Sequence, residues 1–114
     1  MVRDAEPCWR IEVGEDDDLL RERLTRALRE RGHMVMALSN RADALAAIRS
    51  VIFDAAVIDV DLDGGSGLDI AGELLSAQPK VRVVMATGLP TAAHKAEAIR
   101  LGAIGVVSKP FEPR

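Results

Sequence analysis

The sequence has little of what marks several large classes of protein. Its only cysteine is Cys8, so no disulfide can form within the chain, and no apolar run approaches the roughly 20 residues of a membrane-spanning helix. It has no tyrosine, no cluster of basic residues and a formal net charge of −3, which argues against a nucleic-acid surface. With no recognisable signal peptide either, we expect a cytoplasmic protein that contacts neither membrane nor nucleic acid directly.

What is present is the composition of one globular domain. The 114 residues are 48% hydrophobic and 29% charged, which is enough apolar material for a single buried core. Residues 1–8 are predicted to be a polar N-terminal leader, and residues 9–114 a single domain.

Short apolar runs alternate with helical patterns along the chain. The predicted strands are residues 9–14, 34–38, 55–58, 81–86 and 104–107, and apolar residues at helical spacing lie between them. Short connections and right-handed crossovers then predict an α/β fold, a doubly wound five-stranded parallel sheet with strand order 2-1-3-4-5, as in flavodoxin. The last predicted helix begins near Pro90 and should turn Ala92, Ala96 and Ile99 inward.

No helical pattern follows the fifth predicted strand, so we expect part of one sheet face to be uncovered. Glu12 lies within the first predicted strand, where a buried carboxylate without a partner is costly. We expect it to lie on the uncovered face; burial of Glu12 without a charged partner would contradict this.

Polar residues follow four of the predicted strands at the point where each ends. They are Glu15, Asp16, Asp59, Asp61, Thr87 and Lys109. The carboxyl ends of parallel strands meet at one edge of the sheet, where open α/β sheets bind ligands. Carboxylates gathered there repel one another unless a cation such as Mg²⁺ joins them or the pKa of one of them is raised. With a lysine and a threonine beside them, they suit the transfer of a phosphoryl group, and Asp59 is the candidate nucleophile.

The ordered set of these segments resembles the receiver domains of bacterial two-component response regulators, including the chemotaxis receivers. The resemblance runs from about Trp9 to Phe111 and is carried by Glu15-Asp16-Asp17, Asp59 to Gly67, Ala86-Thr87-Gly88 and Ser108-Lys109-Pro110-Phe111. It implies phosphorelay signalling, in which a sensor histidine kinase or a histidine phosphotransfer protein passes a phosphoryl group to this chain. It also implies a phosphoacceptor rather than a turnover enzyme, with an unknown downstream protein as its further partner.

The same resemblance implies a role for each matching residue. Asp59 is the phosphoacceptor, and Glu15, Asp16 and Asp59, with the backbone carbonyl of Asp61, hold Mg²⁺. Thr87 contacts the phosphoryl group and Lys109 pairs with it. The Lys109–Pro110 peptide bond is often cis in the family.

Three departures from the family pattern keep an alternative open. Asp63 stands where the family usually has proline, Val106 stands where many members have a mobile aromatic ring, and the family's fifth helix has no counterpart. The chain could therefore be a receiver-like interaction module that phosphate no longer switches, and a second copy could cover the bare face as a homodimer.

A more distant alternative is a haloacid-dehalogenase-like phosphatase. The run from Asp59 to Gly64 resembles the nucleophile motif of those enzymes, which also form an aspartyl phosphate with Mg²⁺. Two strand–helix units precede the motif in this chain, however, and the acidic residues from Glu15 to Asp17 would then have no function.

Overall fold

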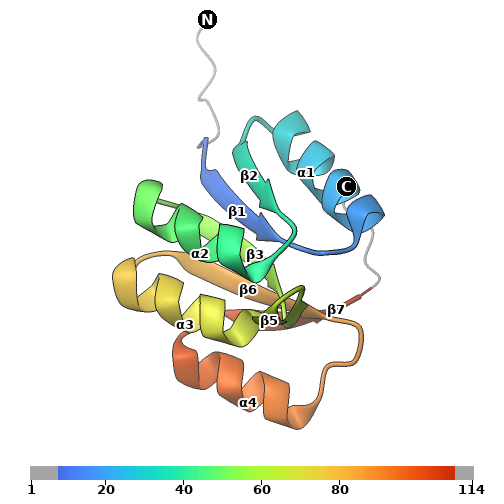
Figure 1. Ribbon diagram of the computed structural model, residues 1–114, viewed down its shortest axis with the longest axis vertical. Helices are drawn as coiled ribbons and strands as arrows, with labels where there is room; N and C mark the ends of the chain where they lie inside the picture. The colour runs from blue at the N-terminus through green and yellow to red at the C-terminus, as the bar shows by residue number, and fades with distance from the viewer. Residues whose placement is uncertain (1–7, 110–114) are drawn as a thin grey trace, which may run out of the picture.

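Five parallel strands form the central sheet (Figure 1). The structure is a computed structural model that describes residues 8–109. The sheet has the order β2-β1-β3-β6-β7, formed by β2 (Met34–Leu38), β1 (Arg10–Gly14), β3 (Ala55–Asp59), β6 (Arg82–Thr87) and β7 (Gly105–Ser108). The predicted α/β class and strand order are confirmed. Residues 1–7, which make up most of the predicted leader, lie outside the described residues, as do the Lys109–Pro110 bond and residues 110–114.

Four helices connect the strands in the described part of the chain. They are α1 (Asp18–Glu30), α2 (Arg41–Ser50), α3 (Gly67–Ala77) and α4 (Ala92–Leu101). Each begins at a side chain that accepts a hydrogen bond from a backbone N–H group of its first turn, and these caps are Asp17, Asn40, Ser66 and Thr91. Helix α4 ends at Gly102, whose φ of 100° suits a residue without a Cβ atom.

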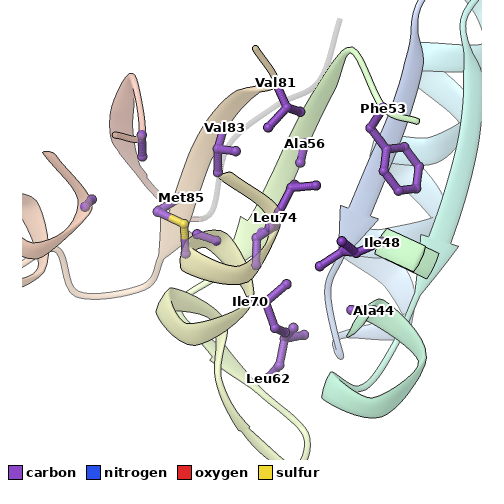
Figure 2. Packing of buried hydrophobic residues seen from close by; sticks show 14 of the residues in the cluster. Ala44, Ile48, Phe53, Ala56, Leu62, Ile70, Leu74, Val81, Val83 and Met85 are labelled. Atoms are coloured by element: carbon purple, nitrogen blue, oxygen red, sulfur yellow. The ribbon is translucent and has the colours of Figure 1, made fainter. Parts of the chain in front are cut away.

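The main hydrophobic core lies between the sheet and helices α2, α3 and α4. Figure 2 shows Ile70 and Leu74 of α3 packed with Met85 of β6, and all three side chains are buried. A smaller cluster of Ile11, Val13 and Leu24 joins the opposite face of the sheet to α1. Among residues 8–109, α1 is the only helix on that face, so the sheet has one well-covered face and one partly covered face.

The structure corrects the prediction that Glu12 lies on the uncovered face of the sheet. Glu12 is 0% exposed, and neither of its carboxylate oxygens has a hydrogen-bond partner among the described residues. It pairs with Met36 and Ala56 in the sheet register and therefore points to the face covered by α2, whereas Ile11 and Val13 point to α1. Glu12 is thus buried without a partner on the well-covered face, and the explanation that it lies on the bare face is wrong.

The predicted orientation of α4 is also wrong. Ala92 and Ala96 are exposed and Ile99 is 69% exposed, whereas Ala98 is the buried position of this helix. Helix α4 has apolar residues on several sides, so its sequence alone does not select the face that packs.

A short hairpin between β3 and α3 was not predicted. Its strands are β4 (Asp61–Leu62) and β5 (Gly65–Ser66), and they pair antiparallel. The Arg41 backbone N–H donates to the Asp63 carbonyl at 2.9 Å, which ties the hairpin to the beginning of α2.

Candidate functional site

The carboxyl ends of β1, β3, β6 and β7 meet at one edge of the sheet. Because all four strands run parallel, the residues that follow them are brought together there. Glu15, Asp59 and Thr87 are buried, Lys109 is partly buried, and Asp16 is exposed. The structure therefore gathers these five predicted residues at one place.

Lys109 joins the two buried carboxylates. Its Nζ lies 2.8 Å from Asp59 Oδ2 and 3.2 Å from Glu15 Oε1. Its backbone N–H donates to the Thr87 carbonyl at 2.7 Å, so the end of β6 sets the point from which the lysine reaches in. The result is a cation held beside a carboxylate that is only 4% exposed, Asp59.

Burial and neighbouring charges alter the acid–base properties of this cluster. Burial raises the pKa of Glu15 to about 7; the Asp17 backbone N–H and Lys109 act against this rise, and the adjacent Asp59 carboxylate adds to it. At Lys109, burial alone would lower the pKa, but hydrogen bonds to Asp59 and Glu15 outweigh it and leave the pKa raised. Lys109 therefore stays charged at neutral pH, whereas Glu15 can hold a proton.

Three carboxylates form a group that suits a divalent cation. One oxygen from each of Glu15, Asp16 and Asp59 lies within 4.8 Å of the others. Mg²⁺ and Ca²⁺ bind to proteins through carboxylate oxygens grouped as closely as these. The residues present fit such an ion, which would also relieve the repulsion between them.

The neighbouring acidic residues have a structural role. Asp17 is the N-cap of α1, and its Oδ1 accepts a hydrogen bond from the Leu20 backbone N–H at 3.0 Å. Asp18 lies in the first turn and forms a salt bridge with Arg21, whose Nη1 also donates to the Glu15 carbonyl. The acidic run is therefore divided between the carboxylate group and the start of a helix.

The loop after Asp59 is closely fitted to that residue. The Asp61 backbone N–H donates to Asp59 Oδ1 at 3.0 Å, and the Asp61 side chain is exposed. A Cβ atom at Gly67 would lie 1.7 Å from the Asp59 carbonyl oxygen, so only glycine fits there. The sequence shows a glycine-rich loop but does not show which glycine contacts the backbone of Asp59.

Thr87 follows Ala86, which pairs with Asp59 in the sheet register. Thr87 Oγ1 accepts a hydrogen bond from the Leu89 backbone N–H at 3.2 Å.

Val106, on the neighbouring strand, is partly buried and packs against the main core. The aliphatic side chain at this position is therefore already part of the core packing.

Comparison with known proteins identifies the family. The response regulator receiver domain matches residues 11–114 of the chain. The chain belongs to the response regulator receiver family. This assignment places the receiver in two-component signalling and favours that interpretation over the phosphatase alternative.

A curated relative supports the assignment of the receiver. The two-component response regulator PhoP of Pseudomonas aeruginosa is 38% identical over 100 residues, a match that covers 88% of this chain and 44% of that protein. The chain spans about half the length of the curated relatives it matches.

Solved structures agree with the fold of the receiver. A response regulator of Burkholderia pseudomallei, crystallised with a phosphorylated aspartic acid, a calcium ion and citrate, is 28% identical with a TM-score of 0.86; the match covers 90% of this chain and 61% of that one. A receiver domain of Methanospirillum hungatei has a TM-score of 0.89 at 23% identity, covering 95% and 86%, which shows the shared fold alone. In the part of this receiver that the structure describes, no helix has the length and apolar character to cross a membrane.

Proposed function

We propose that Asp59 of this receiver accepts a phosphoryl group from a phosphohistidine, with Mg²⁺ held by the carboxylates beside it. The observation that carries the proposal is the buried Asp59 carboxylate, with Lys109 Nζ at 2.8 Å and the Glu15 and Asp16 carboxylates next to it. The related response regulator crystallised with a phosphorylated aspartic acid and a calcium ion supports the same chemistry.

In the transfer step a carboxylate oxygen of Asp59 attacks the phosphorus atom. A P–O bond forms as the P–N bond to the donor imidazole breaks, and the imidazole leaves with the electron pair of that bond. Lys109 then moves its charge from the carboxylate to a phosphoryl oxygen. Thr87 Oγ1 only accepts in its hydrogen bond with Leu89, so its hydroxyl hydrogen is free to donate to another phosphoryl oxygen.

Four groups of this chain would hold the metal ion. They are the side chains of Glu15, Asp16 and Asp59, whose oxygens lie within 4.8 Å of one another, and the backbone carbonyl of Asp61, which is included by resemblance to the family. When bound, the ion supplies positive charge that offsets the negative charge of the phosphoryl oxygens. As a ligand of the ion, Glu15 would have to be deprotonated, because a protonated carboxyl group is a poor ligand.

The donor is a sensor histidine kinase or a histidine phosphotransfer protein in the cytoplasm, and a downstream protein reads the phosphorylated form. Each domain takes up one phosphoryl group and does not hydrolyse small phosphate esters in repeated cycles. A second copy of the chain remains a candidate partner for the partly covered face of the sheet.

The experiment that tests the proposal is labelling with a small phosphoryl donor. Acetyl phosphate and Mg²⁺ should add one phosphoryl group to the parent chain, detected by intact mass, and chelation of the metal should abolish it. The Asp59→Asn variant should remain unlabelled. The matched control is Asp63→Asn, which changes an exposed aspartate in the same loop and should be labelled like the parent. Equal labelling of the Asp59→Asn variant would remove Asp59 from the mechanism.

A further inference from the structure

In the described part of the chain, strand β2 forms one edge of the sheet and has backbone groups without a strand partner. Its only neighbour in the sheet of residues 8–109 is β1 (Figure 1). The Met34 backbone N–H and the Leu38 carbonyl form hydrogen bonds with the residues that flank β1. Because the bonding direction alternates along a parallel strand, Val35 and Ala37 direct their N–H and carbonyl groups away from β1. The Val35 carbonyl accepts from Arg29 Nη2 at 3.1 Å and still has a second lone pair for another donor.

This edge has none of the features that usually prevent another strand from adding to a sheet. Residues Met34–Leu38 are all apolar, whereas exposed edges of soluble proteins commonly carry charged residues, proline or a bulge. Two of its side chains are poorly covered, since Met34 is 57% and Met36 is 37% exposed. Both line an apolar groove of about 240 Å³ on the side of the sheet that α2 covers. The edge therefore offers both hydrogen-bonding groups and apolar surface to a further strand.

Strand β2 is complementary to a second copy of itself. In an antiparallel pair about a twofold axis through Met36, Val35 would lie opposite the partner's Ala37. These two residues would exchange both backbone hydrogen bonds, and the symmetry would repeat the pair. On the other side of the sheet Met36 would meet the partner's Met36, and Met34 would meet the partner's Leu38. Each residue of β2 has an apolar counterpart in this register.

Helix α1 borders the same edge and has opposite net charges on its two halves. The charged residues of α1 that line a groove beside Ala37 are Asp18, Arg21, Glu22, Arg26, Arg29 and Glu30. The first three have a net charge of −1, from two acids and one arginine, and the last three have +1, from two arginines and one acid. The same axis, perpendicular to the sheet, would place the two α1 helices antiparallel on one face. The acidic half of each helix would then lie toward the basic half of the other, which favours this pairing.

We propose that two copies of the chain pair through the β2 edge, antiparallel about Met36, and join their sheets into one. The pairing gives strand partners to the outward groups of Val35 and Ala37 and covers the exposed side chains of Met34 and Met36. Asp59 lies on β3, which β1 separates from β2, so the contact does not use the proposed phosphoacceptor. It also differs from a second copy on the partly covered face, because Met36 points to the side of the sheet that α2 covers.

The test is sedimentation velocity of the full chain at roughly 10–500 µM, with variants at Met36, the residue on the twofold axis. The parent should change from monomer to dimer across this range. Met36→Lys and Met36→Glu each place like charges opposite one another, so each should weaken the dimer roughly tenfold or more. An equimolar mixture of the two variants should form a mixed dimer, because lysine then faces glutamate.

Matched controls keep the test specific to this contact. Ile99→Lys changes a residue that is 69% exposed on α4, the helix that packs against β7 at the other edge of the sheet, and should dimerise like the parent. Glu12 pairs with Met36 in the register, so the Met36 variants are also measured together with Glu12→Gln, where the same order is expected. Both Met36 variants should be labelled by acetyl phosphate like the parent, which shows that they fold and separates this result from the phosphoacceptor proposal.

Amide hydrogen exchange of the parent gives an independent measurement. The Val35 and Ala37 N–H groups should exchange roughly tenfold more slowly in the dimer than in the monomer, whereas the Met36 N–H, which faces β1, should not change. A parent that stays monomeric throughout would overturn the proposal and leave the edge to an extended segment of another protein. Dimerisation that persists in both Met36 variants, or a mixture of them that stays monomeric, would also overturn it.

Discussion

At the scale of single residues, the first strand and its end carry two buried glutamates with opposite surroundings. Glu15 faces Lys109 and accepts hydrogen bonds from it and from the Asp17 backbone N–H. Glu12, three residues earlier, has no partner for either oxygen among the residues described. The first carboxylate belongs to a charge network, whereas the second destabilises the fold whenever it ionises.

Glu12 should make the stability of the domain fall as pH rises. The pKa is about 8 in the folded chain and near 4.5 when unfolded, so between these values the unfolded state releases a proton that the folded state keeps. We expect urea unfolding to show roughly 2–4 kcal/mol lower stability at pH 8 than at pH 5 from this residue. Residue 12 does not titrate in the Glu12→Gln variant, so the variant should lose that part of the slope and keep the part that comes from Glu15, whose pKa is also raised. An unchanged slope would show that Glu12 does not contribute.

Gly67 should be intolerant of a side chain. The Gly67→Ala variant places a Cβ atom against the Asp59 carbonyl, so the loop must shift at a cost of roughly 2–3 kcal/mol. Phosphoryl labelling should fall with it, because the same backbone carries Asp59, the proposed phosphoacceptor. The control is Gly105→Ala, since nothing lies within 4 Å of a Cβ atom there. Similar unfolding midpoints for the two variants would contradict the expectation.

At the scale of elements, the helices and strands follow from local sequence, with a few exceptions that have physical causes. Strands β2 and β3 were predicted from apolar runs, and every helix starts at a side chain able to cap it. The hairpin of β4 and β5 has only two residues in each strand, too few for a periodic pattern. Its position depends on the contact between Asp63 and Arg41, which are distant in the sequence.

The meeting of the candidate site residues was predictable because they follow strands that are neighbours in the sheet, whereas the exact contacts were not. Parallel strands bring their ends together wherever the sheet forms, so Asp59, Thr87 and Lys109 had to meet at one edge. That Lys109 would also contact Glu15, and that Gly67 would touch the Asp59 backbone, depends on loop conformations. The burial of Glu12 was missed because the alternation of a strand does not say which face has the better cover.

The start of α1 should separate stability from metal binding. Asp17→Ala removes the N-cap and should lower the free energy of unfolding by about 1 kcal/mol, with little change in Mg²⁺ affinity. Asp16→Ala removes an exposed carboxylate of the acidic group. It should lower the Mg²⁺ affinity and leave the free energy of unfolding nearly unchanged. Urea unfolding and Mg²⁺ titration of both variants test this pair, and loss of Mg²⁺ binding in the Asp17→Ala variant alone would reverse the assignment.

At the scale of the whole molecule, the two faces of the sheet are unequal within residues 8–109. Helices α2, α3 and α4 cover one face, and α1 covers part of the other. Two adjacent residues of β6 lie on the two faces. Val83 is fully buried in the main core, whereas Val84 is only partly buried on the opposite face.

The same substitution should therefore have different effects at these neighbours. Val83→Thr buries a hydroxyl group in the main core and should cost about 1–3 kcal/mol, whereas Val84→Thr should cost less than about 1 kcal/mol. Urea unfolding of the two variants measures the difference. An equal cost would mean that the second face is covered in solution, and a concentration-dependent unfolding midpoint would identify a second copy as the cover.

The contact between Lys109 and Glu15 joins residues 94 positions apart. During synthesis, Glu15 therefore leaves the ribosome long before Lys109, the lysine that it contacts in the folded domain. Without β7, the Asp59 carboxylate has no Lys109 ammonium group beside it. Under the proposed function, a phosphoryl group can therefore be taken up only after β7 has been synthesised and has joined the sheet.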